Sequence, residues 1–210
     1  MAFMLFASLL ILGVFGRVFL QYRTTGNHGV RPATKNSPPL QKLASFLLVA
    51  SALIIFIYTL GEVLGFFDAL YNTEGSLLVF GYFLYSVGLS ITLLAQHQMG
   101  TAWRIGVDPT EKTSLITNGL YRYVRNPIYT GLFLGGVGLF LISPSIILLV
   151  GMLAFFVSVE LFVKRVEEPY LREQFGEVFR SWYQSTGRYF PKLGSKLVDH
   201  KSINDHTKKP

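Results

Sequence analysis

Long apolar runs separated by short polar segments dominate the pattern of this 210-residue chain. Residues 2–20, 43–66 and 75–95 each approach or reach the roughly 17 to 25 mainly apolar residues that a helix needs to cross a bilayer. A fourth run, residues 128–163, is too long for one span and is interrupted by Ser143-Pro144-Ser145. Because proline starts helices but breaks their interiors, we expect two short spans in a tight hairpin there. The pattern predicts an all-α polytopic membrane bundle of about five transmembrane helices.

The sequence changes character after the hairpin. Residues 167–185 carry Glu, Arg, Phe, Tyr and Trp at roughly helical spacing, which predicts an amphipathic cytoplasmic helix that covers the inner mouth of the hairpin. Residues 194–210 are polar and predict a disordered tail. We therefore divide the chain into a three-span N-terminal scaffold (1–96), a core containing the hairpin (97–193) and the tail.

The charges predict the orientation. The loop after the first span is basic and has no acid, whereas the connection after the second span has acids and no base, and residues 164–210 carry ten of the nineteen Lys and Arg. By the positive-inside rule, the N-terminus should lie outside and the hairpin ends and C-terminus in the cytoplasm. The same loops explain the net charge of +7 by membrane orientation and anionic lipid, so we expect no nucleic-acid partner.

Several kinds of chemistry lack the residues they need. The chain has no cysteine, which removes thiolate nucleophiles, disulfides and Cys-ligated metals. Its four histidines are scattered without the spacing of metal ligands, so no metal site is expected. No Gly-x-Ser-x-Gly elbow or P-loop is present, and the hydrolase and nucleotide-hydrolase classes therefore have no support.

Two polar features lie beside the hairpin. The first contains Tyr121, Arg125, Asn126, Pro127 and Tyr129 immediately before a membrane helix, whose free backbone N–H groups can hold an anion. Taken alone, this pattern is also typical of an interfacial turn with an orienting arginine.

The second feature is Glu167-Glu168, directly after the last span. Paired acids can accept hydrogen bonds from ribose hydroxyls or hold an ammonium group, although such a pair is also typical of a solvated helix face. Gly131, in the first feature, is compatible either with a ligand contact or with close helix packing.

The order and spacing of several short motifs make residues 97–193 resemble the isoprenylcysteine carboxyl methyltransferase family and its relatives, the phospholipid N-methyltransferases. These motifs are His97-Gln98-Met99-Gly100-Thr101-Ala102-Trp103, Leu115-Ile116-Thr117-Asn118-Gly119-Leu120-Tyr121, Arg125-Asn126-Pro127-Ile128-Tyr129-Thr130-Gly131, Glu167-Glu168-Pro169-Tyr170-Leu171, Phe175-Gly176 and Thr186-Gly187-Arg188-Tyr189-Phe190-Pro191.

The resemblance implies a cytoplasmic S-adenosylmethionine pocket in a helical membrane core, closed by the C-terminal segment, with a lipid substrate admitted from the bilayer. By matching position it assigns cofactor contacts to Arg125, Asn126, Pro127, Tyr129 and the Glu167-Glu168 pair, and we count Tyr121 and Gly131 with them. The best-known members have histidine where this chain has Asn126. Asparagine keeps hydrogen bonding but not proton transfer at that position.

The acceptor determines which catalytic residues are needed. A carboxylate acceptor, which we favour, needs no base and can be oriented by Arg165 or Arg188. An amine acceptor must lose a proton, and Glu160 near the end of the fifth span is then the candidate base, although it can equally pair with Lys164. The alternative functions are a phospholipid amine N-methyltransferase, a membrane reductase using NADPH, and a non-catalytic membrane scaffold.

Overall fold

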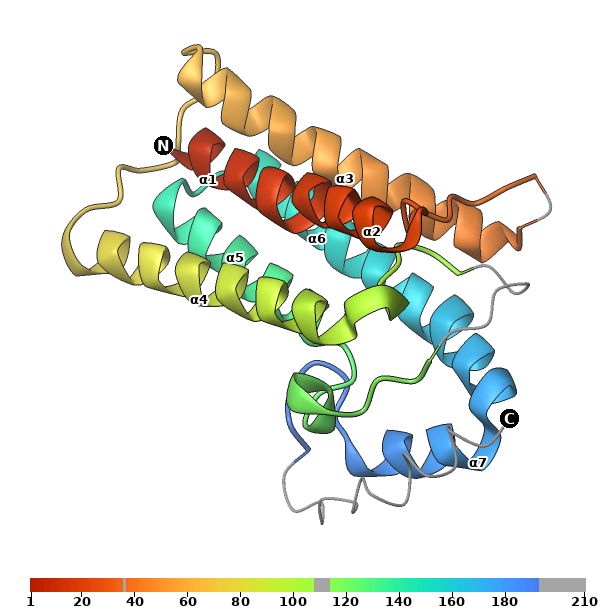
Figure 1. Ribbon diagram of the computed structural model, residues 1–210. Helices are drawn as coiled ribbons and strands as arrows, with labels where there is room; N and C mark the ends of the chain where they lie inside the picture. Colours follow the sequence, from red (N-terminus) through yellow and green to blue (C-terminus); the bar gives the residue numbers. More distant parts are fainter. Residues whose placement is uncertain (36, 108–113, 193–210) are drawn as a thin grey trace.

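The computed structural model describes residues 1–35, 37–107 and 114–192, and the described chain is a bundle of helices without strands (Figure 1). The predicted all-α membrane fold is therefore confirmed, while the predicted tail lies outside the described residues. In chain order the helices are α1 (Ala2–Ser8), the π-helical η1 (Leu9–Phe15), α2 (Gly16–Thr25), α3 (Pro39–Val63), α4 (Gly75–Met99), η2 (Gly100–Ala102), η3 (Gly119–Arg122), α5 (Pro127–Ile142), α6 (Ile146–Phe162), the π-helical η4 (Val163–Glu167) and α7 (Glu168–Ser185).

Four continuous helices in the described chain are long and apolar enough to cross a membrane, namely Ala2–Thr25, Pro39–Val63, Gly75–Ala102 and Ile146–Ser185. The fifth expected span, α5, has 16 residues. At about 1.5 Å per residue it is about 24 Å long, shorter than the roughly 30 Å hydrocarbon core. Its length is limited by Pro127 at its start and by the Ser143-Pro144-Ser145 turn after its end.

The last long helix is too long to lie wholly in lipid. Its 40 residues, Ile146–Ser185, correspond to about 60 Å, twice the thickness of a hydrocarbon core. The apolar part is α6, and the charged residues that begin at Lys164 place η4 and α7 beyond the span. Gly176, with φ of 51°, kinks α7, which turns back toward η3 (Figure 1).

The hairpin packs against the N-terminal helices in two pairs, α4 with α5 and α3 with α6. Glycines bring α4 and α5 close together: a Cβ at Gly88 would lie 2.8 Å from the Cα of Gly135, and one at Gly138 would lie 2.9 Å from the Cα of Tyr85. Such close approach is the usual role of small residues between membrane helices. The division of the chain at residue 96 stays a prediction.

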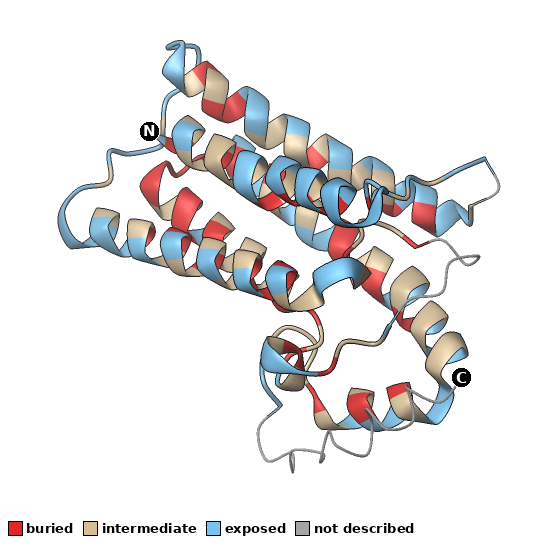
Figure 2. Ribbon diagram, viewed as in Figure 1, coloured by how far each residue is buried: buried red, intermediate tan, exposed pale blue. Residues whose placement is uncertain are grey.

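The polar connections gather at one end of the bundle. The ends of α2, α4 and α6 and the starts of α3 and α5 lie together, and the N-terminus and the α5–α6 turn lie at the opposite end (Figure 1). Only the first of these ends carries the basic loops. The buried face of α7 points into the space below this end (Figure 2).

Candidate functional site

A cavity lies where α4, η3, α5 and α7 meet. Its lining is aromatic and aliphatic on most sides and includes a few polar groups. The lining residues are Met99, Arg104, Gly106, Val107, Ser114, Leu115, Ile116, Tyr121, Arg125, Asn126, Tyr129, Phe162, Val163, Glu167, Glu168, Leu171, Phe179 and Trp182. A concave, largely apolar pocket with a few convergent polar groups is typical of a small-molecule site.

Tyr121 forms one wall, and the end of α4 holds it in place. Gly119 takes φ of 58°, where a side chain would be strained and would also overlap Gln98. Gln98 accepts a hydrogen bond from the backbone N–H of Leu120 at 2.8 Å, which fixes η3 against α4. Burial raises the pKa of Tyr121, so its hydroxyl stays neutral.

The opposite wall is α7, which is anchored to the same short helix. Trp182 donates its indole N–H to the carbonyl of Tyr121 at 2.9 Å, and its ring packs edge-on against Phe179. Because both rings are buried among residues of η3 and α4, they fix the position of the cavity's outer wall.

Residues 186–192, which we name the C-terminal strap, run beside the segment that precedes α5. The backbone N–H of Arg125 donates to the carbonyl of Gly187 at 2.8 Å, and that of Asn126 donates to Arg188 at 3.0 Å. Farther along, Thr130 donates its hydroxyl to the carbonyl of Tyr189 at 2.8 Å. The strap therefore takes up the backbone N–H groups of Arg125 and Asn126 immediately before α5, at the helix end where sequence reasoning placed an anion.

Arg125 is committed to the strap and to α7. Its guanidinium donates to the carbonyls of Tyr183, at 3.0 Å, and of Thr186, and it lies over the Tyr183 ring at 4.0 Å from the centroid. The same side chain forms an ion pair with Glu168 at 3.5 Å. With these partners Arg125 mainly clamps the wall of the cavity, although it also lines it.

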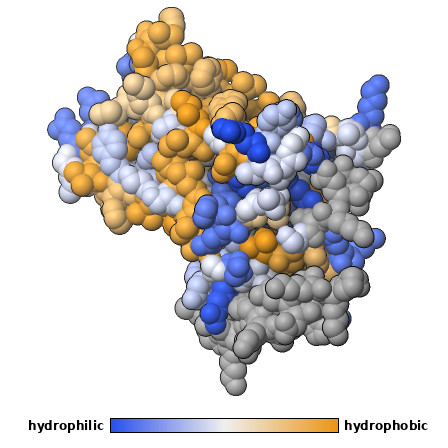
Figure 3. Space-filling view, in the orientation of Figure 1, coloured by the Kyte–Doolittle hydropathy of each residue, from blue (hydrophilic) through white to orange (hydrophobic). Residues whose placement is uncertain are grey.

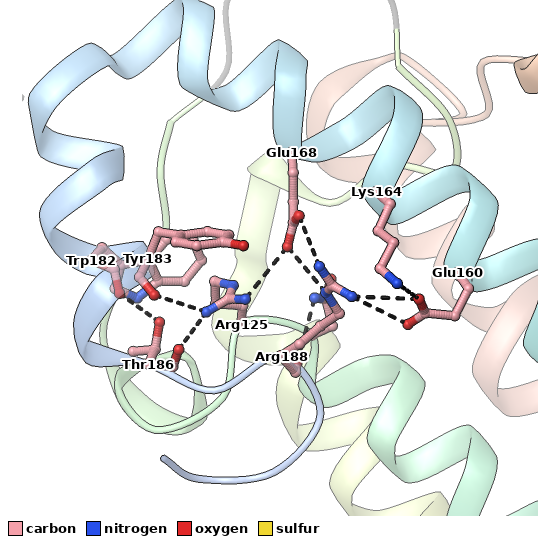
Figure 4. A network of polar contacts seen from close by, with 9 residues as sticks. Arg125, Glu160, Lys164, Glu168, Trp182, Tyr183, Thr186 and Arg188 are labelled. Atoms are coloured by element: carbon pink, nitrogen blue, oxygen red, sulfur yellow. Dashed lines mark hydrogen bonds and ion pairs between the residues drawn. The ribbon is translucent and has the colours of Figure 1, made fainter. Parts of the chain in front are cut away.

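Glu168 lies at the centre of an ion network that joins three segments of the chain (Figure 4). It is 8% exposed and accepts two hydrogen bonds from Arg188, at 3.1 and 3.2 Å, besides the pair with Arg125. Arg188 also contacts Glu160 at 3.4 Å, and Glu160 pairs with Lys164 at 2.8 Å, one turn along α6 and η4. Glu168 is thus neutralised by two arginines, and Glu160 by two cations.

Glu167 has a different environment, although it is adjacent in sequence. It lines the cavity, and its Oε2 is buried without a hydrogen-bond partner in the described chain. Burial and the charge of Glu168, opposed by Arg104, raise the pKa of Glu167 to about 7. A buried carboxylate oxygen without a partner is costly, and such groups mark places where a ligand or ion belongs.

The other predicted site residues divide between cavity and packing. Asn126 and Tyr129 line the cavity with Tyr121, and Asn126 occupies the N-cap position of α5 without a capping hydrogen bond from its side chain. Pro127 is buried at the first turn of α5, and Gly131 faces α4, where a Cβ would overlap Thr92. The surroundings of Gly131 therefore favour close helix packing over a ligand contact.

None of the three predicted catalytic residues lines the cavity. Glu160 and Arg188 meet in the ion network beside it. Arg165 is exposed on η4 and belongs to neither group. The structure thus brings Glu160 and Arg188 together and leaves Arg165 apart.

Sequence reasoning missed Arg104 as a lining residue. It follows Trp103 directly, at the end of the first motif, and its guanidinium lies 5.3 Å from the centroid of the Tyr170 ring on α7. The signal was present, because Arg104 is the first cation after that motif. Phe179 and Trp182 were read as part of an amphipathic face, and only the fold shows that this face lines a cavity.

The family model described as phospholipid methyltransferase matches residues 76–178, which contain α4, both hairpin helices and most of α7. No curated protein matches the chain. The match and the apolar helices together support a membrane methyltransferase. They support the broader family rather than its isoprenylcysteine branch, so the earlier resemblance is confirmed in its coarser form.

Proposed function

We propose that this protein is an integral membrane methyltransferase that uses S-adenosylmethionine and acts on a lipidic acceptor. The observation that carries the proposal is the unpartnered Oε2 of Glu167 in a cavity walled by tyrosine and tryptophan rings. A carboxylate with aromatic faces around it suits a ligand that is both cationic and aromatic.

The donor set suits this cofactor. Glu167 would hold its ammonium or ribose hydroxyls, and Arg104, which also lines the cavity, would hold its carboxylate. Tyr121 and Tyr129 offer ring faces to a sulfonium, an attraction worth roughly 0.5 to 2 kcal/mol. When bound, the cofactor supplies a methyl group already activated by that sulfonium, so this chain's residues have to align the acceptor and exclude water.

The cavity is too small for this cofactor unless α7 moves. The cavity measures about 80 Å³, whereas small-molecule pockets hold roughly 300 to 1,000 Å³. Gly176 is the kink in α7, and no atom of another part of the chain lies within 4 Å of where its Cβ would be. We therefore expect the cofactor to be admitted by an outward shift of α7 about Gly176.

A carboxylate acceptor is supported better than an amine. Glu160 is held by Lys164 and Arg188, and a carboxylate that is ion-paired in this way is a weak base. A carboxylate oxygen can accept the methyl group without losing a proton, and Arg188, in the ion network beside the cavity, would orient it. The amine acceptor remains the second candidate, because a phospholipid methyltransferase model matches the chain.

Two measurements test the proposal on the full chain in nanodiscs. Calorimetric titration with S-adenosylmethionine should show binding, and titration with NADPH should show none. Binding of NADPH alone would favour the reductase, and binding of neither would favour the scaffold. Transfer of a radiolabelled methyl group into a total lipid extract would then identify the acceptor.

We propose, as before, that the N-terminus lies outside and the cavity faces the cytoplasm. Because the chain has no cysteine, single exposed positions can be labelled. In oriented membranes, Ser181→Cys on α7 should react with an impermeant maleimide only from the cytoplasmic side, and Asn72→Cys only from the outside. The reverse pattern would refute the orientation.

A further inference from the structure

A second, open-sided cavity of about 350 Å³ adjoins the first at the inner end of the N-terminal helix. Gln21 and Thr25 of α2 line one side and residues 101–104 line the other. Arg104 and Ser114 belong to both cavities, so the two share a wall. Its volume falls within the range of ligand pockets.

The wall of this second cavity is firmly built. Residues 29–31 pair with Ile105 in a short parallel bridge, with hydrogen bonds of 2.8 and 2.7 Å. Gly29 has φ of 70° and packs against Trp103 so closely that a Cβ would lie 3.1 Å from the ring. Gln21 donates to the carbonyl of Thr101 at 2.9 Å and thereby ties α2 to the opposite side.

Two cations are among the described residues that line the cavity. Among its described lining residues Arg31 and Arg104 are cationic and none is acidic. Behind the Trp103 ring lies Arg17, 5.1 Å from the centroid, which is buried and whose Nε has no hydrogen-bond partner in the described chain. A concave site lined by one sign of charge concentrates ligands of the opposite sign.

The opening lies at the surface where lipid would end. Phe19, Leu20 and Tyr22, on the last turns of the same helix, are exposed apolar side chains, with Phe19 61% exposed. Figure 3 shows hydrophilic residues gathered where the apolar helices meet the lower part of the molecule. A lipid whose chains lie against α2 would therefore bring its headgroup to this cavity.

From these observations we infer that the second cavity binds the oxyanion of a lipid headgroup, a phosphate or carboxylate, and holds the acceptor beside the cofactor cavity. The inference rests on the proposed function, since it takes the first cavity as the cofactor site. Arg104 lines both cavities and would therefore lie between the two ligands.

Thr101 provides a matched test, because its side chain is exposed and lines only the second cavity. Thr101→Glu adds a negative charge, and Thr101→Gln adds the same bulk without it. The probe is dihexanoyl phosphatidic acid, titrated into the full chain in detergent, with dihexanoylglycerol as the phosphate-free lipid and inorganic phosphate as the lipid-free anion.

We expect phosphatidic acid to bind Thr101→Glu at least about fivefold more weakly than Thr101→Gln, as a like charge about 4 Å away implies even in water. Equal weakening by both variants, equal binding of dihexanoylglycerol, or no binding to the parent would overturn the headgroup site. Inorganic phosphate binding as tightly as the lipid would overturn its assignment to a lipid.

The cofactor is titrated separately into the same variants. Its affinity should stay within about twofold of the parent in both, since Thr101 does not line the first cavity. If S-adenosylmethionine fails to bind any variant while phosphatidic acid binds as expected, the proposed function fails and the headgroup site stands. If S-adenosylmethionine binds and phosphatidic acid does not, the cofactor site stands and the headgroup site fails.

Discussion

Replacing Glu167 by glutamine should remove the part of the pH dependence of cofactor binding that comes from this side chain. With a pKa of Glu167 near 7, the empty cavity mostly holds a proton below pH 7, and a cationic ligand must displace it. Glutamine has the same shape and no charge to titrate. Glu177→Gln is the matched control, because Glu177 lies on α7, is exposed and pairs only with Arg180 among the described contacts.

The size of the effect follows from the ionised fraction. With a pKa of about 7, Glu167 is about nine-tenths ionised at pH 8 and about one-tenth ionised at pH 6. If only the ionised form binds the cofactor, its affinity should fall about tenfold between these two values. The cofactor's own amine titrates near pH 8, and dividing the parent's affinity by that of Glu167→Gln removes this contribution.

The stability of the ligand-free protein should change with pH in the opposite sense to the cofactor affinity. The folded pKa of Glu167 lies above its unfolded value of 4.5, so the contribution of this one group to stability is largest below pH 4.5 and is lost as the pH rises from there through 7. Glu167→Gln should therefore raise the melting temperature at pH 8 and do so less at pH 5.

Calorimetric titration in nanodiscs at pH 6, 7 and 8 measures the affinities, and thermal unfolding of the ligand-free protein measures the stabilities. The reasoning fails if Glu167→Gln binds as tightly as the parent at pH 8. It also fails if the parent and Glu167→Gln show the same pH dependence of affinity.

Three further outcomes follow from the packing and the ion network. Glu168→Ala should leave the buried guanidinium of Arg125 and the half-buried one of Arg188 without their shared anion and lower the free energy of unfolding by about 3 kcal/mol. Thermal unfolding and protease cleavage of the strap measure this, and unchanged cleavage would contradict the clamp. Gly88→Ala should destabilise the α4–α5 contact by about 1 to 3 kcal/mol. Gly13→Ala is the control and should have no such cost, because a Cβ there meets nothing within 4 Å. Equal melting temperatures of the two variants would refute the close approach. Without ligand, amide hydrogen exchange should be faster in α7 than in α6, and the exchange in α7 should slow when S-adenosylmethionine binds. Binding without a change of exchange in α7 would show that no shift of this helix is needed.

The bundle could be predicted because lipid leaves few alternatives. An apolar run of sufficient length must satisfy its backbone internally, and the Ser143-Pro144-Ser145 interruption placed the hairpin turn within a residue of where it lies. What the pattern could not predict was the length of the last helix. Its continuation from α6 through η4 into α7 depends on contacts with η3, which periodicity does not record.

The site was predicted less well than the fold, for two physical reasons. Glu167 and Glu168 look like a pair in the sequence, but neighbours on a helix point about 100° apart. Both line the cavity, yet Glu168 is paired with Arg125 and Arg188, whereas Oε2 of Glu167 has no hydrogen-bond partner in the described chain. Arg125 looked like a ligand for an anion, but the anion it meets is Glu168. Partners that lie some 40 or 60 residues away in the sequence cannot be paired without the fold.

The division between the two glutamates suggests how the site can both bind and release its cofactor. Because Glu168 is neutralised by two arginines, Glu167 is the acid in the described lining that is left to respond to a ligand. With a pKa near 7, Glu167 can take up a proton when the cavity is empty and can release that proton to solvent at little cost when a cationic ligand binds. Once the methyl group has left, the sulfur is a neutral thioether and the attraction to Glu167 and to the surrounding rings is weaker. A carboxylate held rigidly ionised by arginines, as Glu168 is, would offer no comparable difference between cofactor and product.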